Sequence, residues 1–218
     1  MENVVVFGSG RHSKVIIDIL EMMGSYRIIG IIDGAREIGE EIMGYSVIGD
    51  LPILKTHPHT ITGGIVALGE NGARRNMVND ILRMDKNFKF IRAIHPSAVI
   101  GNYVSIGNGT AVMANTVINS ATTVGDHCII NTKSSVDHDC QLGDFVSIAP
   151  GATLGGGVTV GDHSTVSLGA NVIHNITIGE HTVVGAGSTV LKNIGAYAVA
   201  YGTPARKIRV RAEDETYL

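Results

Sequence analysis

The chain has 218 residues, a formal net charge of -3 at pH 7, 44% apolar residues and only 5% aromatic residues. This length holds one large or two ordinary domains, and the acidic balance argues against a general nucleic-acid-binding protein. No apolar run reaches the roughly 18 residues of a membrane-spanning helix, and the N-terminus lacks the basic start of a signal peptide. We therefore expect a cytoplasmic protein without membrane insertion.

The N-terminal part predicts a small, mostly parallel α/β domain. Buried strands are expected at residues 3–7, 28–32, 61–68 and 88–94, an edge strand at 44–48, and helices at 14–23, 51–55 and 73–84. In open sheets of this class, ligands bind where the strands end, which places Gly8, Asp33 and Gly69 along one candidate binding edge.

The first strand leads into the turn Gly8-Ser9-Gly10-Arg11-His12-Ser13, then a helix, a second strand and Asp33. This order begins a nucleotide-binding βαβ unit, in which the turn and the helix N-terminus bind a phosphate. The third glycine of the dinucleotide pattern is missing. A mononucleotide or nucleotide-linked ligand is therefore favoured over a nicotinamide cofactor, and the alternative is a tight turn that binds nothing.

A repeat begins at Ile94, and every sixth residue up to Val190 is Ile, Val or Leu. Helices repeat about every 3.6 residues and strands every 2, so neither explains this period. Three hexamers make one triangular coil of 18 residues, and stacked coils bury the aliphatic column. Glycine also recurs every 18 residues from Gly107 to Gly179, where we expect a tight corner. The sequence thus predicts a parallel β-helix.

Most of the nine histidines have an ordinary explanation. His127, His163 and His181 share one position of the 18-residue lattice, and we expect them to be exposed corner residues. His57 and His59 lie in a predicted loop.

His138 differs because Asp137 and Asp139 flank it. A carboxylate on one imidazole nitrogen fixes the tautomer and leaves the other nitrogen to accept a proton, so His138 is a candidate general base. His174 has the same lattice position without carboxylate neighbours. Between the two lies Gly156, within a run of glycines that lets a ligand approach the backbone, and its N–H is a candidate oxyanion donor.

The two cysteines, Cys128 and Cys140, both occupy the small-residue position of a hexamer, twelve residues apart. We expect buried thiols on different faces of the coil, not a disulfide or a metal site. An inward-facing thiol also disfavours an acyl-cysteine intermediate. After Val190 the repeat ends in a tail with a basic cluster at Arg206, Lys207, Arg209 and Arg211, for which a solvated tail is the simplest interpretation.

The segments GSGRHSKVIIDIL, IIGIIDG, HPSAVIG and YGTPARKIR, together with the repeat and VDHDC, resemble a branch of the left-handed β-helix acyltransferases. This branch contains bacterial nucleotide-sugar N-acetyltransferases and sialic acid O-acetyltransferases, and the match covers essentially the whole chain. It implies a Rossmann-like nucleotide-sugar-binding domain at 1–92, a left-handed parallel β-helix acyltransferase domain at 93–194, and a tail at 195–218 that contributes to acetyl-CoA binding.

The resemblance also implies a homotrimer with active sites between subunits, acetyl-CoA as donor without a metal, and a UDP-linked amino sugar as acceptor; the sequence alone does not distinguish UDP from GDP. His138 would be the base, Asp139 its orienting partner and Gly156 the oxyanion donor. The implied nucleotide-sugar positions are Ser9, Gly10, Arg11, His12 and Asp33, and Gly8 and Gly69 join them from the expected binding edge of the sheet. Ser147 falls on a family position on the acetyl-CoA side. An extended pantetheine arm that follows the solenoid axis from Gly156 would pass Leu168 and Ala186 toward Arg206 and Lys207, which are our other expected acetyl-CoA positions. Arg11 and Ser147 depart from the family pattern, which commonly has glycine and a second histidine there.

Acetyl transfer to the amine of a nucleotide-linked amino-deoxy sugar, in surface glycan synthesis, is the function that these residues favour. The alternatives are an O-acetyltransferase acting on a sialic or related sugar, with the same residues and a hydroxyl acceptor, and a non-catalytic trimeric scaffold that binds sugar nucleotides.

Overall fold

The computed structural model describes residues 1–56, 60–213 and 215–216. His57 and His59, expected in a loop, lie outside the described residues. The chain divides into two compact units, Met1–Pro96 and Ser97–Leu218. Within the described ranges, no helix combines the length and apolarity that crossing a bilayer requires.

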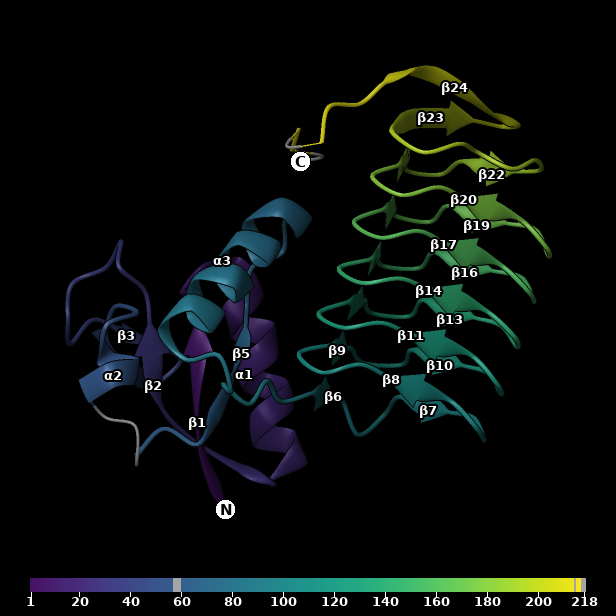
Figure 1. Ribbon diagram of the computed structural model, residues 1–218. Coiled ribbons are helices and arrows are strands. Elements are labelled where there is room, and N and C mark those ends of the chain that lie inside the picture. The colour runs from purple at the N-terminus through teal and green to yellow at the C-terminus, as the bar shows by residue number, and fades with distance from the viewer. Residues whose placement is uncertain (57–59, 214, 217–218) are drawn as a thin grey trace. The chain divides into compact units, whose positions relative to one another are not determined.

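The first unit is an α/β sheet with the strand order β3-β4-β2-β1-β5 (Figure 1). Its elements are β1 (Glu2–Phe7), α1 (Arg11–Met23), β2 (Tyr26–Ile32), β3 (Glu41–Ile42), β4 (Tyr45–Gly49), α2 (Ile53–Thr56), β5 (Gly63–Val66), α3 (Asn71–Met84) and β6 (Ala93–Ile94). β1 runs parallel to β2 and β5, and β2 parallel to β4. The expected mostly parallel α/β arrangement is confirmed, and β1, which lies between β2 and β5, is fully buried from Val4 to Phe7.

Two strand predictions in this unit were wrong in detail. The strand expected at the edge, now β4, has a neighbour on each side, because β3 pairs with it in an antiparallel hairpin. The strand expected at 88–94 is reduced to a bridge between Phe90 and Gly64 and to β6. The Phe88 ring instead packs edge-on against Phe7, with ring centroids 5.5 Å apart, so this apolar run fills the core more than it extends the sheet.

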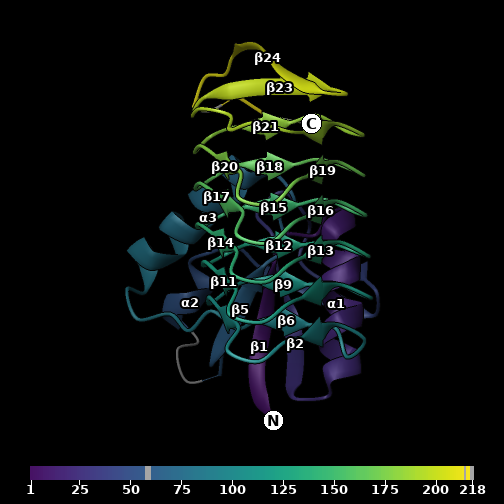
Figure 2. The same ribbon diagram turned by 90° about the vertical axis from the view of Figure 1, so that its right-hand side faces the viewer.

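The second unit is a left-handed parallel β-helix whose coils stack along its length (Figures 1 and 2). In the described chain its strands form three sheets. The β13 sheet holds β7 (Val99–Ile100), β10 (Val117–Ile118), β13 (Ser135–Val136), β16 (Thr153–Leu154), β19 (Asn171–Val172) and β22 (Thr189–Val190). The β14 sheet holds β8 (Ser105–Ile106), β11 (Thr123–Val124), β14 (Gln141–Leu142), β17 (Thr159–Val160) and β20 (Thr177–Ile178). The β15 sheet includes β9 (Ala111–Val112), β12 (Ile129–Ile130), β15 (Ser147–Ile148), β18 (Thr165–Val166), β21 (Val183–Val184), β23 (Ala198–Gly202) and β24 (Ala205–Val210).

The coil length predicted from the sequence is confirmed by strand register. Each strand pairs with the one a coil away, as Val117 does with Ser135 and Ile118 with Val136. The aliphatic residue that ends each strand is buried from Ile106 to Val190, so the column with a period of six is the core of the β-helix.

The loops between the sheets form three corners of the β-helix. The His138 corner joins the β13 sheet to the β14 sheet and comprises residues 101–104, 119–122, 137–140, 155–158, 173–176 and 191–194. The aromatic corner joins the β14 sheet to the β15 sheet and comprises residues 107–110, 125–128, 143–146, 161–164 and 179–182. The Leu168 corner joins the β15 sheet to the β13 sheet and comprises residues 113–116, 131–134, 149–152, 167–170 and 185–188.

The aromatic corner contradicts the expectation of exposed histidines. His127 and His181 are buried, and the rings of His127, Phe145, His163, His181 and Tyr197 form a continuous stack with centroids 4.7 to 5.1 Å apart. The same residues occupy the left-handed backbone position of their turns, with φ between 50° and 58°. Ring stacking between coils is therefore available to offset that strain.

Glycine recurs at this corner because the next coil passes close by, not because of a left-handed backbone. A Cβ on Gly107 would lie 2.4 Å from the carbonyl oxygen of Gly125, and one on Gly125 would lie 2.6 Å from that of Gly143. No side chain fits in that gap, so the 18-residue glycine period reports the spacing between coils.

The C-terminal segment is not a free tail, although the side chains of Arg206, Lys207 and Arg209 are exposed, as expected of a solvated segment. β23 extends the β15 sheet by pairing with β21, and β24 returns antiparallel to β23. Arg211 follows this hairpin, is 4% exposed, and donates from Nη1 to the carbonyl oxygen of His181 at 3.2 Å. The hairpin and this arginine fix the basic segment at the end of the β-helix.

Candidate active site

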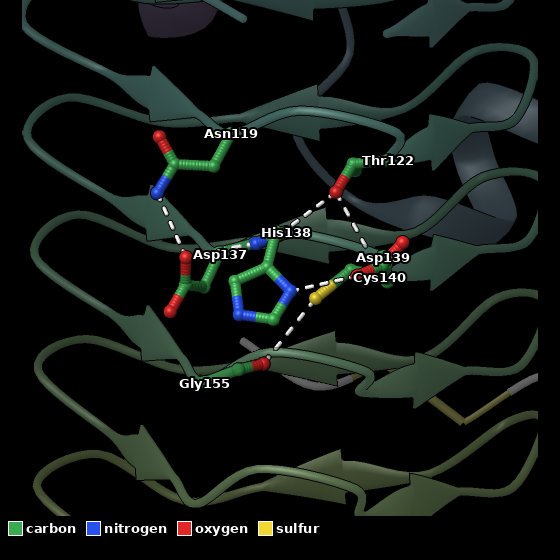
Figure 3. Close-up of polar contacts among 7 residues, drawn as sticks. All are labelled: Asn119, Thr122, Asp137, His138, Asp139, Cys140 and Gly155. Carbon is green, nitrogen blue, oxygen red and sulfur yellow. Dashed lines mark hydrogen bonds and ion pairs between the residues drawn. The ribbon is translucent and has the colours of Figure 1, made fainter. Parts of the chain in front are cut away.

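His138 lies in the turn between β13 and β14, with its side chain 62% exposed. Asp139 occupies the left-handed position of the turn, φ 58°, a conformation that aspartate tolerates better than most residues. From there its Oδ2 lies 2.7 Å from His138 Nδ1 (Figure 3). Asp137 accepts hydrogen bonds at Oδ1 from the His138 backbone N–H and from Asn119 Nδ2, each at 2.8 Å. One carboxylate thus holds the backbone of His138 and the other holds its ring.

These carboxylates also set the electrostatics of the imidazole. The hydrogen bond that His138 donates to Asp139, followed by the negative charge of Asp137, raises the pKa of His138 above its ordinary value. Because Nδ1–H donates to Asp139 in the neutral ring, Nε2 carries the free lone pair. The arrangement is a basic nitrogen held in a fixed tautomer and orientation.

The ring borders a cavity of about 470 Å³ whose lining includes Gly155, Gly156 and Gly157. A Cβ on Gly156 would lie 2.6 Å from His138 Cε1 and 2.7 Å from Nε2, so only glycine fits beside the imidazole. Among the described residues, no acceptor pairs with the backbone N–H of Gly156. A base and an available N–H donor therefore meet in one cavity.

His174, expected to be only a lattice counterpart of His138, lines the same cavity together with Asn175. A carboxylate follows His138 in the sequence, whereas Asn175 follows His174. Two histidines thus share the cavity, and the hydrogen bond to Asp139 distinguishes His138 from His174.

The residues expected to bind acetyl-CoA lie in different places. Leu168 and Ala186 lie at the Leu168 corner and Ser147 lies on β15, and none of the three lines the His138 cavity. Arg206 and Lys207 lie on β24, and both line another cavity, of about 420 Å³.

Lys192, which was not predicted from the sequence, lines this basic cavity as well. Lys192 belongs to the His138 corner, three coils beyond His138 in the 18-residue lattice. The 18-residue spacing could have placed Lys192 at this corner, since residues 138, 156, 174 and 192 share one lattice position. The basic hairpin therefore meets the corner that carries the imidazole.

In the first unit, the structure joins Ser9 to Asp33. Asp33 Oδ2 accepts from the backbone N and Oγ of Ser9 at 2.8 and 2.5 Å, and Oδ1 accepts from the backbone N of Ala35 at 2.9 Å. Partial burial raises the pKa of Asp33, but these hydrogen bonds outweigh it and leave the pKa below its ordinary value. Asp33 thus ties the glycine-rich turn to the end of β2. A cavity of about 250 Å³ adjoins it, lined in part by Leu51, Pro52 and Met77.

The other predicted nucleotide-sugar residues cluster near this turn. Gly10 precedes α1 and provides no side-chain cap, and the exposed Arg11 is the first residue of that helix. Burial, followed by the charge of Arg74, lowers the pKa of His12 to about 4. Arg74 also donates to the carbonyl oxygen of Gly69 at 3.0 Å, so His12 and Gly69 meet around one buried guanidinium.

Gly8 is required by its conformation and its surroundings. Its φ is 97°, and a Cβ there would lie 2.8 Å from Leu68 Cδ2. The first glycine of the turn thus allows β1 to end tightly against the segment that follows β5.

Both cysteines are buried, as expected. Burial raises the pKa of the Cys140 thiol, which makes it a poor nucleophile. In the part of the chain that the structure describes, no group of three or more His, Cys, Asp or Glu side chains is placed to hold a metal ion.

Comparisons with known proteins agree with this architecture. The family model of the PglD N-terminal domain matches residues 3–81. PerB from Caulobacter crescentus, solved with CoA and GDP-perosamine, is 37% identical, with a TM-score of 0.86 over 95% of this chain and 97% of that one. The acetyltransferase domain of PglB from Neisseria gonorrhoeae FA1090, solved with acetyl coenzyme A, is 33% identical, with a TM-score of 0.88 over 95% of this chain and 99% of that one.

A curated relative is the UDP-N-acetylbacillosamine N-acetyltransferase of Bacillus subtilis (strain 168). It is 36% identical over 117 residues, and the match spans about half of each protein, 52% of this chain and 52% of the relative. The structural relatives match over nearly their whole length and share the α/β unit, the β-helix and substantial identity. The chain therefore belongs to the nucleotide-sugar N-acetyltransferase family that carries a PglD-type N-terminal domain.

Proposed function

We propose that this protein transfers the acetyl group of acetyl-CoA to the amine of a nucleotide-linked amino-deoxy sugar. One observation carries the proposal: an imidazole held at Nδ1 by Asp139 has its Nε2 beside Gly156, whose N–H is available. The family relatives support the substrate class, since their names refer to a UDP-linked and a GDP-linked sugar.

The chemistry follows from the two groups. His138 Nε2 removes a proton from the sugar amine as its nitrogen bonds to the thioester carbon. Gly156 N–H binds the negative charge that develops on the carbonyl oxygen. The C–S bond then breaks, and the CoA sulfur leaves with the proton from the imidazolium. One C–N bond replaces one C–S bond, directly and without an acyl-enzyme. Asp139 stabilises the imidazolium during the step.

The parts of the chain divide this task. Residues 1–92 bind the sugar nucleotide through the turn at Gly8–Ser13 and Asp33, and residues 93–194 carry the chemistry. The tail at 195–218 contributes Arg206 and Lys207, which with Lys192 bind the phosphates of CoA. Three coils at about 4.8 Å each put Lys192 about 14 Å along the corner from His138, which suits an extended pantetheine arm.

A homotrimer with shared sites accounts for the remaining residues. Within one chain, Leu168 and Ala186 lie at a different corner from His138. A single acetyl-CoA reaches both corners if a neighbouring copy supplies one of them, which calls for a closed cyclic oligomer. Light scattering should give about three times 23.0 kDa at micromolar concentration. A stable monomer would contradict this assembly. Since acetyl-CoA is an intracellular metabolite, we place the reaction in the cytoplasm.

The decisive experiment is a panel of acceptors incubated with acetyl-CoA, the protein and a thiol reagent. We expect CoA release with UDP-linked or GDP-linked amino sugars. Release only with hydroxyl acceptors would indicate O-acetylation, and tight binding of sugar nucleotides without any release would indicate a scaffold.

The same assay tests the base. His138→Ala should lose about 10² to 10⁴ in rate, as expected for a lost general base. His174→Ala is the matched control, because both histidines line the same cavity but only His138 is held by a carboxylate. Equal losses would mean general damage to the cavity and would refute the assignment.

A further inference from the structure

Small side chains inside the β-helix hold the turn peptides of the coil above. Thr122 Oγ1 donates to the carbonyl oxygen of Asp137 at 2.7 Å, and Ser164 Oγ donates to that of Gly179 at 2.7 Å, each spanning fifteen residues. In these coils, the small residue of the hexamer therefore also forms a hydrogen bond that holds the first peptide group of a corner in place.

At the candidate active site the anchor is a thiol. Cys140 Sγ donates to the carbonyl oxygen of Gly155 at 3.3 Å, and its backbone N donates to Thr122 Oγ1 at 3.1 Å (Figure 3). The Gly155 carbonyl belongs to the same peptide group as the Gly156 N–H. The thiol thus bonds one end of the peptide whose other end is the proposed oxyanion donor.

Equivalent peptides at the aromatic corner show what such an N–H binds. Cys128 Sγ holds the carbonyl oxygen of Gly143 at 3.0 Å, and the N–H at the other end of that peptide, on Asp144, donates to Asp162 Oδ1 at 2.9 Å. The anchored peptide there presents its N–H to a carboxylate oxygen. At Gly156 the corresponding N–H has no acceptor in the described chain, and the His138 ring lies beside it.

We propose that Cys140 is a positioning residue for acetyl transfer, whose thiol fixes and polarises the Gly155–Gly156 peptide so that its N–H receives the acyl oxygen. The inference rests on the proposed function. Glycines on both sides leave this peptide without side chains to restrain it, so the bond to its carbonyl replaces that restraint. A hydrogen bond at the carbonyl also strengthens the N–H of the same amide as a donor.

The test compares three variants in the full-length protein with acetyl-CoA and the best acceptor of the panel. Cys140→Ala should lower kcat by about 3- to 30-fold, less than the 10²- to 10³-fold typical when an oxyanion donor is removed, because the N–H remains. KM for both substrates and the pH at which kcat/KM rises should stay as in the wild type. Cys140→Ser should restore kcat to within about twofold, since Ser164 makes the same bond from the same position.

Cys128→Ala is the matched control, because it removes a thiol from the same hexamer position at a corner away from His138. It should keep the wild-type kcat while its unfolding temperature falls by about as much as that of Cys140→Ala. A wild-type kcat in Cys140→Ala, or equal kcat losses in both alanine variants, would overturn the inference. A wild type that releases no CoA with any acceptor would instead refute the proposed function, so the two failures are distinguishable.

Discussion

Replacing Gly156 with alanine tests the candidate site with the smallest perturbation that the structure allows. The added methyl group would lie 2.6 Å from His138 Cε1 and 2.7 Å from Nε2. Carbon atoms pack at about 3.5 to 4.0 Å, so the imidazole must move by about 1 Å. The backbone of Gly156 is not left-handed, so alanine brings no strain of its own.

The displaced ring can swing outward, because His138 is exposed, so we expect the unfolding temperature to change little. A misplacement of 1 Å at a reacting group costs about 10²-fold in rate. We therefore expect kcat of Gly156→Ala to fall by about 10²-fold in the thiol-release assay, with smaller changes in KM. Moving the ring also weakens its bond to Asp139, which lowers the raised pKa of His138. The rising limb of kcat/KM against pH should then shift to lower pH.

A wild-type kcat in Gly156→Ala, with unchanged stability, would refute the reasoning, because the ring would have moved without affecting the reaction. His138→Ala in the same assay gives the residual rate expected when the base is absent altogether. If Gly156→Ala were slow but retained the wild-type pH profile, the loss would point to a blocked acyl oxygen and not to a displaced base.

Asp139→Asn should give a rate between those of the wild type and His138→Ala, with its pH limb shifted down, because the carboxylate that raises the pKa of His138 is gone; a pH titration of kcat/KM measures both. Lys192→Ala should raise KM for acetyl-CoA several-fold and leave KM for the sugar nucleotide unchanged, most clearly at low salt. Gly8→Ala should lower the free energy of unfolding by about 1 to 3 kcal/mol, because a φ of 97° and the contact with Leu68 both disfavour a side chain; thermal unfolding measures it.

The fold was largely predictable because the period of six leaves few alternatives. Ile118, Val136 and Leu154 follow one another at the coil spacing, and the structure stacks them in parallel. The short strands of the first unit were harder to predict from the sequence. β3 has only two residues, and the segment around Phe90 has a strand-like composition but pairs at a single bridge. In segments of only a few residues, the packing of rings such as Phe88 decides whether a strand forms more than the intrinsic strand propensity of the residues does.

The candidate site was predictable where neighbours in sequence are neighbours in space. Asp139 follows His138, so their contact depends on one turn. Contacts that cross coils were not foreseen. The bond from Asn119 to Asp137 spans one coil, and the meeting of Lys192 with the basic hairpin depends on how β24 folds back. The shared lattice position of the corner histidines was recognised, but their burial was missed because the rings of Phe145 and Tyr197, which stack on them, were not considered with them.

The antiparallel return of β24 also limits how the molecule can grow. A parallel β-helix that ends on a bare coil offers a ladder of backbone groups to which another chain could add, as in a fibril. Here β24 runs antiparallel to β23, so a coil of another chain that approached this end could not continue the parallel stacking of the β-helix. Arg206 and Lys207 place positive charges along that edge, whereas Arg209 is paired with Glu215. The segment proposed to hold the donor phosphates thus also protects the end of the solenoid against end-to-end polymerisation.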